Sequence, residues 1–135
     1  MKIAFQIPGR VKGWQRARYN SKTGAVFNSA ELQTSQGLIK DFANRAMGEA
    51  RPFTGALKMT VRVLIRRPKS HTGKKRTVFV TGFPDYDNTL KTLGDSMNHI
   101  VYDDDRQIAV VEFERRYTDD NESVAVTIEQ LEAVL

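Results

Sequence analysis

The sequence predicts an α+β fold: a mixed β-sheet of about four strands with two helices packed on it. Three observations predict this fold. Apolar and polar residues alternate in four separate segments, as in half-buried strands. Two other segments repeat apolar residues at helical spacing. The chain of 135 residues is long enough to bury one core, so we expect a single domain over residues 1–135.

The predicted strands cover residues 2–8, 57–66, 108–117 and 124–128. The second of these shows the clearest alternation, because every other position from Leu57 to Ile65 is apolar. The last two strands flank the polar residues 118–122 and are expected to form a hairpin. Residues 77–80 are largely β-branched or aromatic, which predicts a short strand or an extended approach to the next segment.

The first predicted helix runs from a cap at Asn28 or Ser29 to about Ala50, before Arg51-Pro52 ends it. Its apolar stripe is a packing surface made by Leu32, Ile39, Phe42, Ala43 and Ala46. The second predicted helix is shorter, and Asp87 is expected to cap it. Its apolar positions are Leu90, Leu93 and Met97.

The composition limits the compartment and the chemistry. There is no cysteine, which excludes disulfides, thiolate metal sites and a cysteine nucleophile, and which fits a reducing cytosol. No apolar run approaches membrane-spanning length, and the first residues show no signal-peptide pattern. We therefore expect a cytoplasmic protein with no membrane partner.

Charge is unevenly distributed along the chain. Residues 1–84 contain seventeen Lys and Arg but three acidic residues, whereas residues 85–106 contain six Asp and only two basic residues. The pI of about 9.6 favours a nucleic-acid partner, although ribosomal or membrane-surface contact would give the same value. An acidic pocket on a basic molecule suggests that one part holds a polyanion while metal-assisted chemistry occurs at another.

Two basic segments are candidates for DNA contact. In residues 10–28, which we expect to form a loop, Lys12, Arg16 and Arg18 are interleaved with aromatic residues. Such a segment can follow a phosphate backbone and stack on bases, or it can be a solvated loop whose aromatics cap the core, and spacing does not separate these two interpretations. The second segment is the loop of residues 68–76, which includes Lys74, Lys75 and Arg76.

The acidic residues between Pro84 and Ile108 carry the strongest chemical signal. In an extended chain Asp85 and Asp87 share one face, and the run of residues 103–105 supplies further carboxylates. Crowded carboxylates suit one or two Mg²⁺ ions, and Lys91, one helical turn after Asp87, could offset charge on a reacting phosphate. For any single aspartate, a helix cap or a turn explains the residue better, but for the whole set with Lys91 it explains less.

Two other motifs compete for the same residues. Asp85-x-Asp87-x-Thr89 is similar to the first motif of haloacid-dehalogenase-type phosphatases, but only fifty residues follow Asp85, too few for the remaining motifs. The spacing from Asp103 to Glu114 imitates a calcium-binding loop. That interpretation fails, because Ile108 stands where such a loop needs glycine.

The segment PDYDNTLKTLGDSMNHIVYDDDRQI resembles the signature of RusA-type Holliday junction resolvases. That signature runs Pro-Asp-x-Asp-Asn-x-x-Lys, a helix, then Asp-Asp-x-Gln and an apolar residue. The opening strand, the basic loop, the capped first helix and the closing hairpin match in order, so nearly the whole chain is covered. The resemblance implies a Mg²⁺-dependent nuclease, with Mn²⁺ as a substitute, that cuts four-way DNA junctions by paired symmetric nicks in recombination and repair. It also implies a homodimer, whose two-fold symmetry suits such a junction.

Carried over position by position, the resemblance implies that Asp85, Asp87 and Asp105 bind the metal and that Lys91 is the catalytic lysine. Asp104 is the alternative third ligand, because the extra acid at Asp103 leaves the register open by one residue. Phe83 stands where relatives often carry Lys or Arg, which puts one phosphate contact in doubt. The alternative function is a branched-DNA-binding protein without catalysis.

Overall fold

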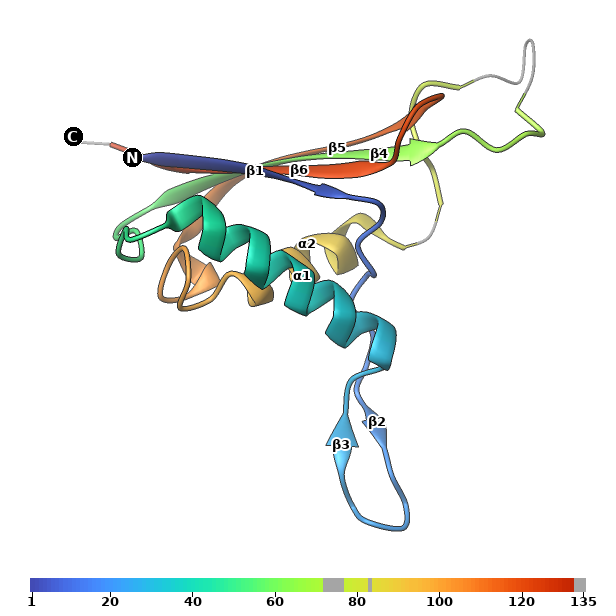
Figure 1. Ribbon diagram of the computed structural model, residues 1–135, viewed down its shortest axis with the longest axis horizontal. Coiled ribbons are helices and arrows are strands. Elements are labelled where there is room, and N and C mark those ends of the chain that lie inside the picture. Colours follow the sequence, from blue (N-terminus) through green and yellow to red (C-terminus); the bar gives the residue numbers. More distant parts are fainter. Residues whose placement is uncertain (72–76, 83, 133–135) are drawn as a thin grey trace.

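The computed structural model describes residues 1–71, 77–82 and 84–132 and forms two layers. A four-stranded sheet makes one layer, and two helices cover one of its faces (Figure 1). A two-stranded hairpin extends away from both layers. The elements are β1 (Lys2–Pro8), β2 (Arg18–Tyr19), β3 (Val26–Phe27), α1 (Ala30–Met47), β4 (Leu57–Arg66), α2 (Tyr86–Ser96), the 3₁₀ helix η2 (Asp105–Gln107), β5 (Ile108–Thr118) and β6 (Ser123–Gln130).

The sheet is mixed, with strand order β1-β6-β4-β5. β6 pairs antiparallel with both β1 and β4, while β4 and β5 are parallel. Parallel neighbours need a crossover connection, and here residues 67–107 provide it. The predicted α+β class with a mixed four-stranded sheet and two helices is therefore confirmed, and the crossover brings α2 beneath the sheet.

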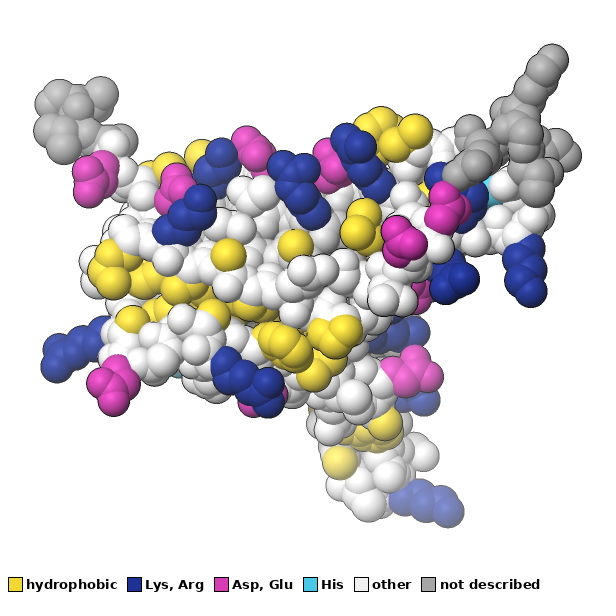
Figure 2. All heavy atoms as spheres, turned by 45° about the horizontal axis from the view of Figure 1, so that its top comes forward, with side chains coloured by type: hydrophobic (Ala, Val, Ile, Leu, Met, Phe, Trp, Pro, Cys, Tyr) yellow, Lys and Arg dark blue, Asp and Glu magenta, His cyan; other side chains and the backbone are white. Residues whose placement is uncertain are grey.

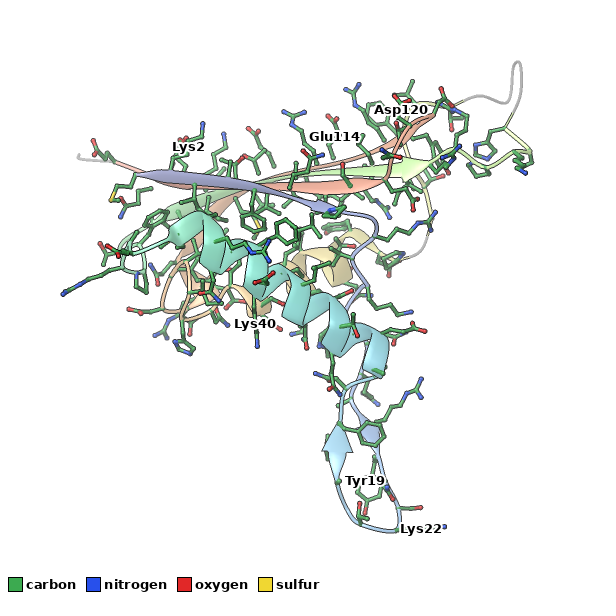
Figure 3. The ribbon with its side chains drawn as sticks, in the orientation of Figure 1. Lys2, Tyr19, Lys22, Lys40, Glu114 and Asp120 are labelled. Carbon is green, nitrogen blue, oxygen red and sulfur yellow. The ribbon has the colours of Figure 1, made fainter. Side chains whose placement is uncertain are left out.

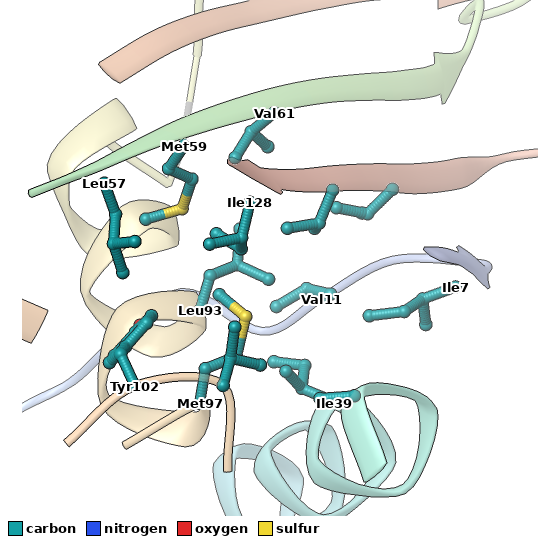
Figure 4. Packing of buried hydrophobic residues seen from close by; sticks show 14 of the residues in the cluster. Ile7, Val11, Ile39, Leu57, Met59, Val61, Leu93, Met97, Tyr102 and Ile128 are labelled. Atoms are coloured by element: carbon teal, nitrogen blue, oxygen red, sulfur yellow. The ribbon is translucent and has the colours of Figure 1, made fainter. Parts of the chain in front are cut away.

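The core lies between the sheet and the helices because one face of each strand is apolar. On β4 the inward residues Leu57, Met59, Val61 and Val63 are all buried, and the alternate positions are more exposed. They share the core with Ile39 of α1, Leu93 of α2, Met97 at the end of α2 and Ile128 of β6 (Figure 4).

The opposite face of the sheet is covered with charged side chains of both signs (Figure 2). Cross-strand ion pairs connect them, including Lys58 with Glu112 at 3.0 Å and Arg62 with Glu114 at 3.6 Å. Such exposed pairs contribute little stability, but they keep this face hydrated. The helices therefore cover only one side of the sheet.

Helix α1 begins and ends for local reasons. The Ser29 hydroxyl accepts a hydrogen bond from the amide of Leu32 at 3.2 Å, as the sequence predicted for this cap. The helix ends at Gly48, whose φ of 56° is easily adopted by glycine, three residues before Arg51-Pro52. Leu32, Ile39 and Ala43 are buried, as the apolar stripe predicted.

Two segments differ from the sequence prediction. Residues 10–28, expected to be a loop, contain the hairpin β2–β3. Residues 77–80, expected to be a short strand or an extended approach to the next segment, do not form a strand and make an isolated bridge between Phe79 and Arg116. No helix within the described ranges combines the length and the apolar character needed to cross a membrane.

Candidate active site

The first pair of carboxylates lies at the start of α2. Asp85 occupies the N-cap position, with φ −60° and ψ 149°, yet its side chain makes no capping hydrogen bond. Asp87 follows in the first turn, where its Oδ1 accepts a hydrogen bond from the amide of Asn88 at 3.0 Å. Both residues are exposed. The expectation that Asp87 would cap this helix is thus wrong by two residues, because the amides of Asn88 and Thr89 already bond to the Asp85 carbonyl.

Arg115 of β5 holds the chain that leads into this pair. Its Nη1 donates to the carbonyl oxygens of Gly82 at 2.9 Å and Pro84 at 2.7 Å. Arg115 also lines an open concavity of about 510 Å³ together with Gly82, Asp85, Tyr86 and Asp87. Sequence reasoning missed this residue, since nothing in the order of the chain connects it to residues 82–87.

Lys91 lies one turn beyond Asp87, and Trp14 positions it. The Lys91 Nζ is 4.8 Å from the centre of the Trp14 ring, within the range of a cation–π interaction. The Trp14 amide donates to the Asn88 carbonyl at 2.9 Å. A Cβ on the neighbouring Gly13 would lie 2.6 Å from the Pro84 Cβ, so this position requires glycine. The basic loop is therefore seated directly on the first turn of α2.

The second pair of carboxylates lies near the far end of α2, where Asp105 approaches Asp95. Burial, followed by the neighbouring carboxyl groups of Asp95 and Asp104, raises the pKa of Asp105. The Tyr102 hydroxyl donates to the Gly94 carbonyl at 2.6 Å, and burial, together with these aspartates, raises its pKa as well. Asp95 was not predicted as a site residue, although its position four residues after Lys91 was a signal.

Asp104 has a structural role. Its side chain accepts from the Arg106 amide at 2.9 Å and caps η2, and that hydrogen bond lowers its pKa. Gln107 completes the cap, because its Oε1 accepts from the Asp103 and Asp104 amides while its Nε2 donates to the carbonyls of Phe53 and Gly55. The acidic run is thereby fixed to the chain before β4, with Asp105 facing α2.

The oxygen donors are of the type that Mg²⁺ prefers, but their arrangement does not form one compact site. Within the described ranges, no three acidic or histidine side chains are close enough together to hold one ion. The eight residues from Asp87 to Asp95 correspond to roughly 12 Å along a helix. The structure thus brings Asp85 near Asp87 and Asp105 near Asp95, and it does not bring these two pairs together.

The predicted DNA-binding residues occupy different surroundings. Lys12 pairs with Glu31 at 3.2 Å beside a concavity of about 860 Å³ between the basic loop and the start of α1. Arg16 and Arg18 are exposed where the hairpin leaves the body. Lys74, Lys75 and Arg76 lie outside the described residues, as does Phe83.

Comparison with known proteins identifies the family. A family model described as endodeoxyribonuclease RusA matches residues 8–129, nearly the whole chain. The chain belongs to the RusA family. The matched range includes the loop with Trp14, all of α2 and the acidic run. RusA membership supports a nuclease that acts on DNA, with branched DNA as its partner.

The chain is also similar to a curated bacterial protein. It is 26% identical over 129 residues to the uncharacterized protein YqaN of Bacillus subtilis (strain 168), an alignment that covers 87% of this chain and 89% of the relative. The two proteins therefore match over most of their lengths.

Proposed function

We propose that this chain is a Mg²⁺-dependent endonuclease that resolves four-way DNA junctions by paired symmetric nicks. The observation that carries the proposal is the exposed pair Asp85 and Asp87, the second of them one turn from Lys91, in a chain of the RusA family. Asp85 makes no capping hydrogen bond, and Asp87 accepts from the Asn88 amide through Oδ1, which leaves carboxylate oxygen atoms available for a ligand. Recombination and repair are the processes in which such an activity is used.

The proposed roles follow from the surroundings of each side chain. Lys91, held over the Trp14 ring, would stabilise the negative charge that develops on the scissile phosphate. Arg115 would fix the approach to Asp85 through its two carbonyl contacts. A bound Mg²⁺ would supply charge neutralisation and an activated water.

For the metal ligands we propose Asp85, Asp87 and Asp105, and we prefer Asp105 to Asp104 because Asp104 Oδ1 already caps η2. Since the structure separates Asp105 from the other two, its role needs its own test. Isothermal titration of Mg²⁺ into the wild type, Asp87→Asn and Asp105→Asn proteins supplies it. We expect at least ten-fold weaker binding in both variants, and unchanged affinity in Asp105→Asn would remove that residue from the ligand set.

Cleavage of a synthetic four-way junction in Mg²⁺ tests the function itself. We expect the wild type to introduce paired nicks and Asp87→Asn to lose at least a hundred-fold in rate. The matched control is Asp41→Asn, the same change of charge at an exposed residue of α1 that pairs with Arg45. Equal cleavage by the wild type and Asp87→Asn would contradict the proposal.

The alternative function is branched-DNA binding without catalysis. The separation of the two carboxylate pairs favours it, because the described residues assemble no three-ligand site. Tight junction binding with no cleavage in either Mg²⁺ or Mn²⁺ would support this alternative. Turnover of p-nitrophenyl phosphate would instead support the phosphatase motif, and we expect none.

A further inference from the structure

The hairpin β2–β3 projects from the body as an arm of residues 17–28. Figure 1 shows it extending beyond the start of α1, and Figure 3 places Tyr19 and Lys22 toward its far end. The arm leaves the body next to Trp14, which packs on Lys91, and it returns at the Ser29 cap of α1. Its root therefore adjoins the candidate active site.

The arm is an organised element because Asn20 builds its turn. The Asn20 side chain accepts from the amides of Lys22 and Thr23, while its amide donates to the Ala25 carbonyl at 2.8 Å. Gly24 donates back to the Asn20 carbonyl and has a φ of 72°, a conformation that suits glycine. This turn holds the two short strands in one register.

That register gives the arm two distinct faces. Tyr19 lies opposite Val26, and Arg18 lies opposite Phe27, so each pair shares one side of the hairpin. Tyr19 and Val26 are 68% and 70% exposed, and Phe27 is 44% exposed. A two-stranded hairpin is marginal in water by itself, so such exposed apolar side chains indicate a surface that a partner covers.

The charge of the arm identifies the kind of partner. Residues 14–28 contain Arg16, Arg18 and Lys22 and no acidic residue, a net charge of +3. The partner should therefore be anionic and should also present flat apolar surfaces. DNA bases with an exposed face and their phosphates meet both requirements, because an aromatic ring can stack on a base while neighbouring cations contact the backbone.

We propose that the arm recognises the branch point of a DNA junction, with Tyr19 stacking on a base whose face is exposed where the junction arms meet and with Arg18 and Lys22 contacting adjacent phosphates. This inference rests on the proposed function, since it assumes a branched DNA substrate. It also explains selectivity, because a continuous linear duplex offers phosphates to the cations but stacks its bases on one another and leaves no base face for Tyr19.

The test measures binding separately from cleavage. In EDTA, the wild type is titrated into a four-way junction that carries 2-aminopurine at the branch point and into a linear duplex of the same sequence. Tyr19→Ala should bind the junction about ten-fold more weakly and lose the 2-aminopurine response, since one stacked base is worth about 1–3 kcal/mol. Tyr19→Phe, which keeps the ring, should behave as the wild type, and the melting temperatures of all three should agree because the arm lies outside the core.

The outcomes separate the inference from the proposed function. If the wild type prefers the junction and Tyr19→Ala binds it equally well with the same fluorescence, the arm does not read the branch point, although the function stands. If Tyr19→Ala changes the solution mass of the protein instead, the arm contacts a second copy of the chain and the inference is wrong. If the wild type shows no preference for the junction over duplex, the proposed function and the inference fail together.

Discussion

The position of Lys91 depends on a residue seventy-seven places earlier in the chain. Trp14 supplies both a π face for the ammonium group and an amide that bonds to the Asn88 carbonyl in the first turn of α2. The side chain of Lys91 is otherwise exposed and free to adopt many rotamers. Trp14 therefore acts as a positioning residue for the proposed catalytic lysine.

We expect Trp14→Leu to slow junction cleavage about five-fold, since an exposed cation–π interaction is worth about 1 kcal/mol. Trp14→Phe keeps an aromatic face and should retain most of the rate. The measurement is single-turnover cleavage at saturating junction. On a Lys91→Ala background, Trp14→Leu should have no further effect, and an equal five-fold loss there would show that Trp14 acts only on the fold.

Whether a residue of the candidate site could be predicted depends on how far apart in the sequence it and its partners lie. Asp85, Asp87, Lys91 and the acidic run could be predicted, because they form one continuous segment. Trp14 and Arg115 could not, because each meets α2 or residues 82–84 only after the chain has folded. The capping role of Asp104 in η2 could not be predicted either, because the run of three aspartates does not show which of them begins the turn.

At the level of elements, Glu122 attaches the turn between β5 and β6 to the end of β4 and to the segment that follows β1. Its Oε2 accepts from the Arg66 amide at 2.9 Å and from Arg10 at 2.7 Å. Burial disfavours the charged carboxylate, but these hydrogen bonds and the two positive charges outweigh it and lower the pKa of Glu122 below its usual 4.5. The charged form of Glu122 therefore stabilises the folded state.

The stabilisation that Glu122 provides should be larger at neutral pH than at acidic pH. A carboxyl group whose pKa is lowered by folding stabilises the protein above its ordinary pKa, and that stabilisation is lost as the pH falls through the folded value. We expect Glu122→Gln to reduce the free energy of unfolding by about 1 kcal/mol at pH 7, and the difference should become smaller at pH 3, below the usual pKa of 4.5. Urea denaturation at the two pH values measures it.

Glu129→Gln is the matched control for this prediction. Glu129 pairs with Lys2 at 3.7 Å across β6 and β1, but both side chains are largely exposed, so the loss should be small at either pH. If Glu122→Gln lowered the free energy of unfolding by the same amount at pH 3 as at pH 7, the shape of the side chain and not its charge would explain the role of Glu122.

The four long strands and both helices could be predicted because their patterns repeat over seven residues or more. The hairpin β2–β3 could not, because two residues per strand are too few to show alternation. Its turn did leave a signal, since Asn20 and Gly24 are residues that favour reversals. The same limit applies to residues 77–80, where a single bridge replaces the expected strand.

At the level of the whole molecule, paired cuts need two active centres, whereas one chain contains a single α2. We therefore propose a two-fold symmetric dimer as the functional unit, with a solution mass about twice the 15.3 kDa of the chain. A cruciform plasmid reads out its activity, because two cuts yield linear DNA and one cut yields a relaxed circle.

Mixed dimers that contain one wild-type and one Asp87→Asn subunit should convert the plasmid mainly to relaxed circles. Mixed dimers that contain Asp41→Asn in place of Asp87→Asn should linearise it as the wild type does. Linear product from the mixed dimers with Asp87→Asn, or full activity from a 15.3-kDa monomer, would rule out a dimer with one active centre in each subunit.

The central place of β6 in the sheet also affects how the protein assembles during synthesis. β6 lies between β1 and β4 and is made of residues 123–130, so neither neighbour can pair with it until the ribosome has translated these residues. Pairings between such distant parts of a chain form slowly. The segment that carries α2 would thus pack against a complete sheet only at the end of synthesis. A nascent chain that lacks β6 would not contain an assembled nuclease centre.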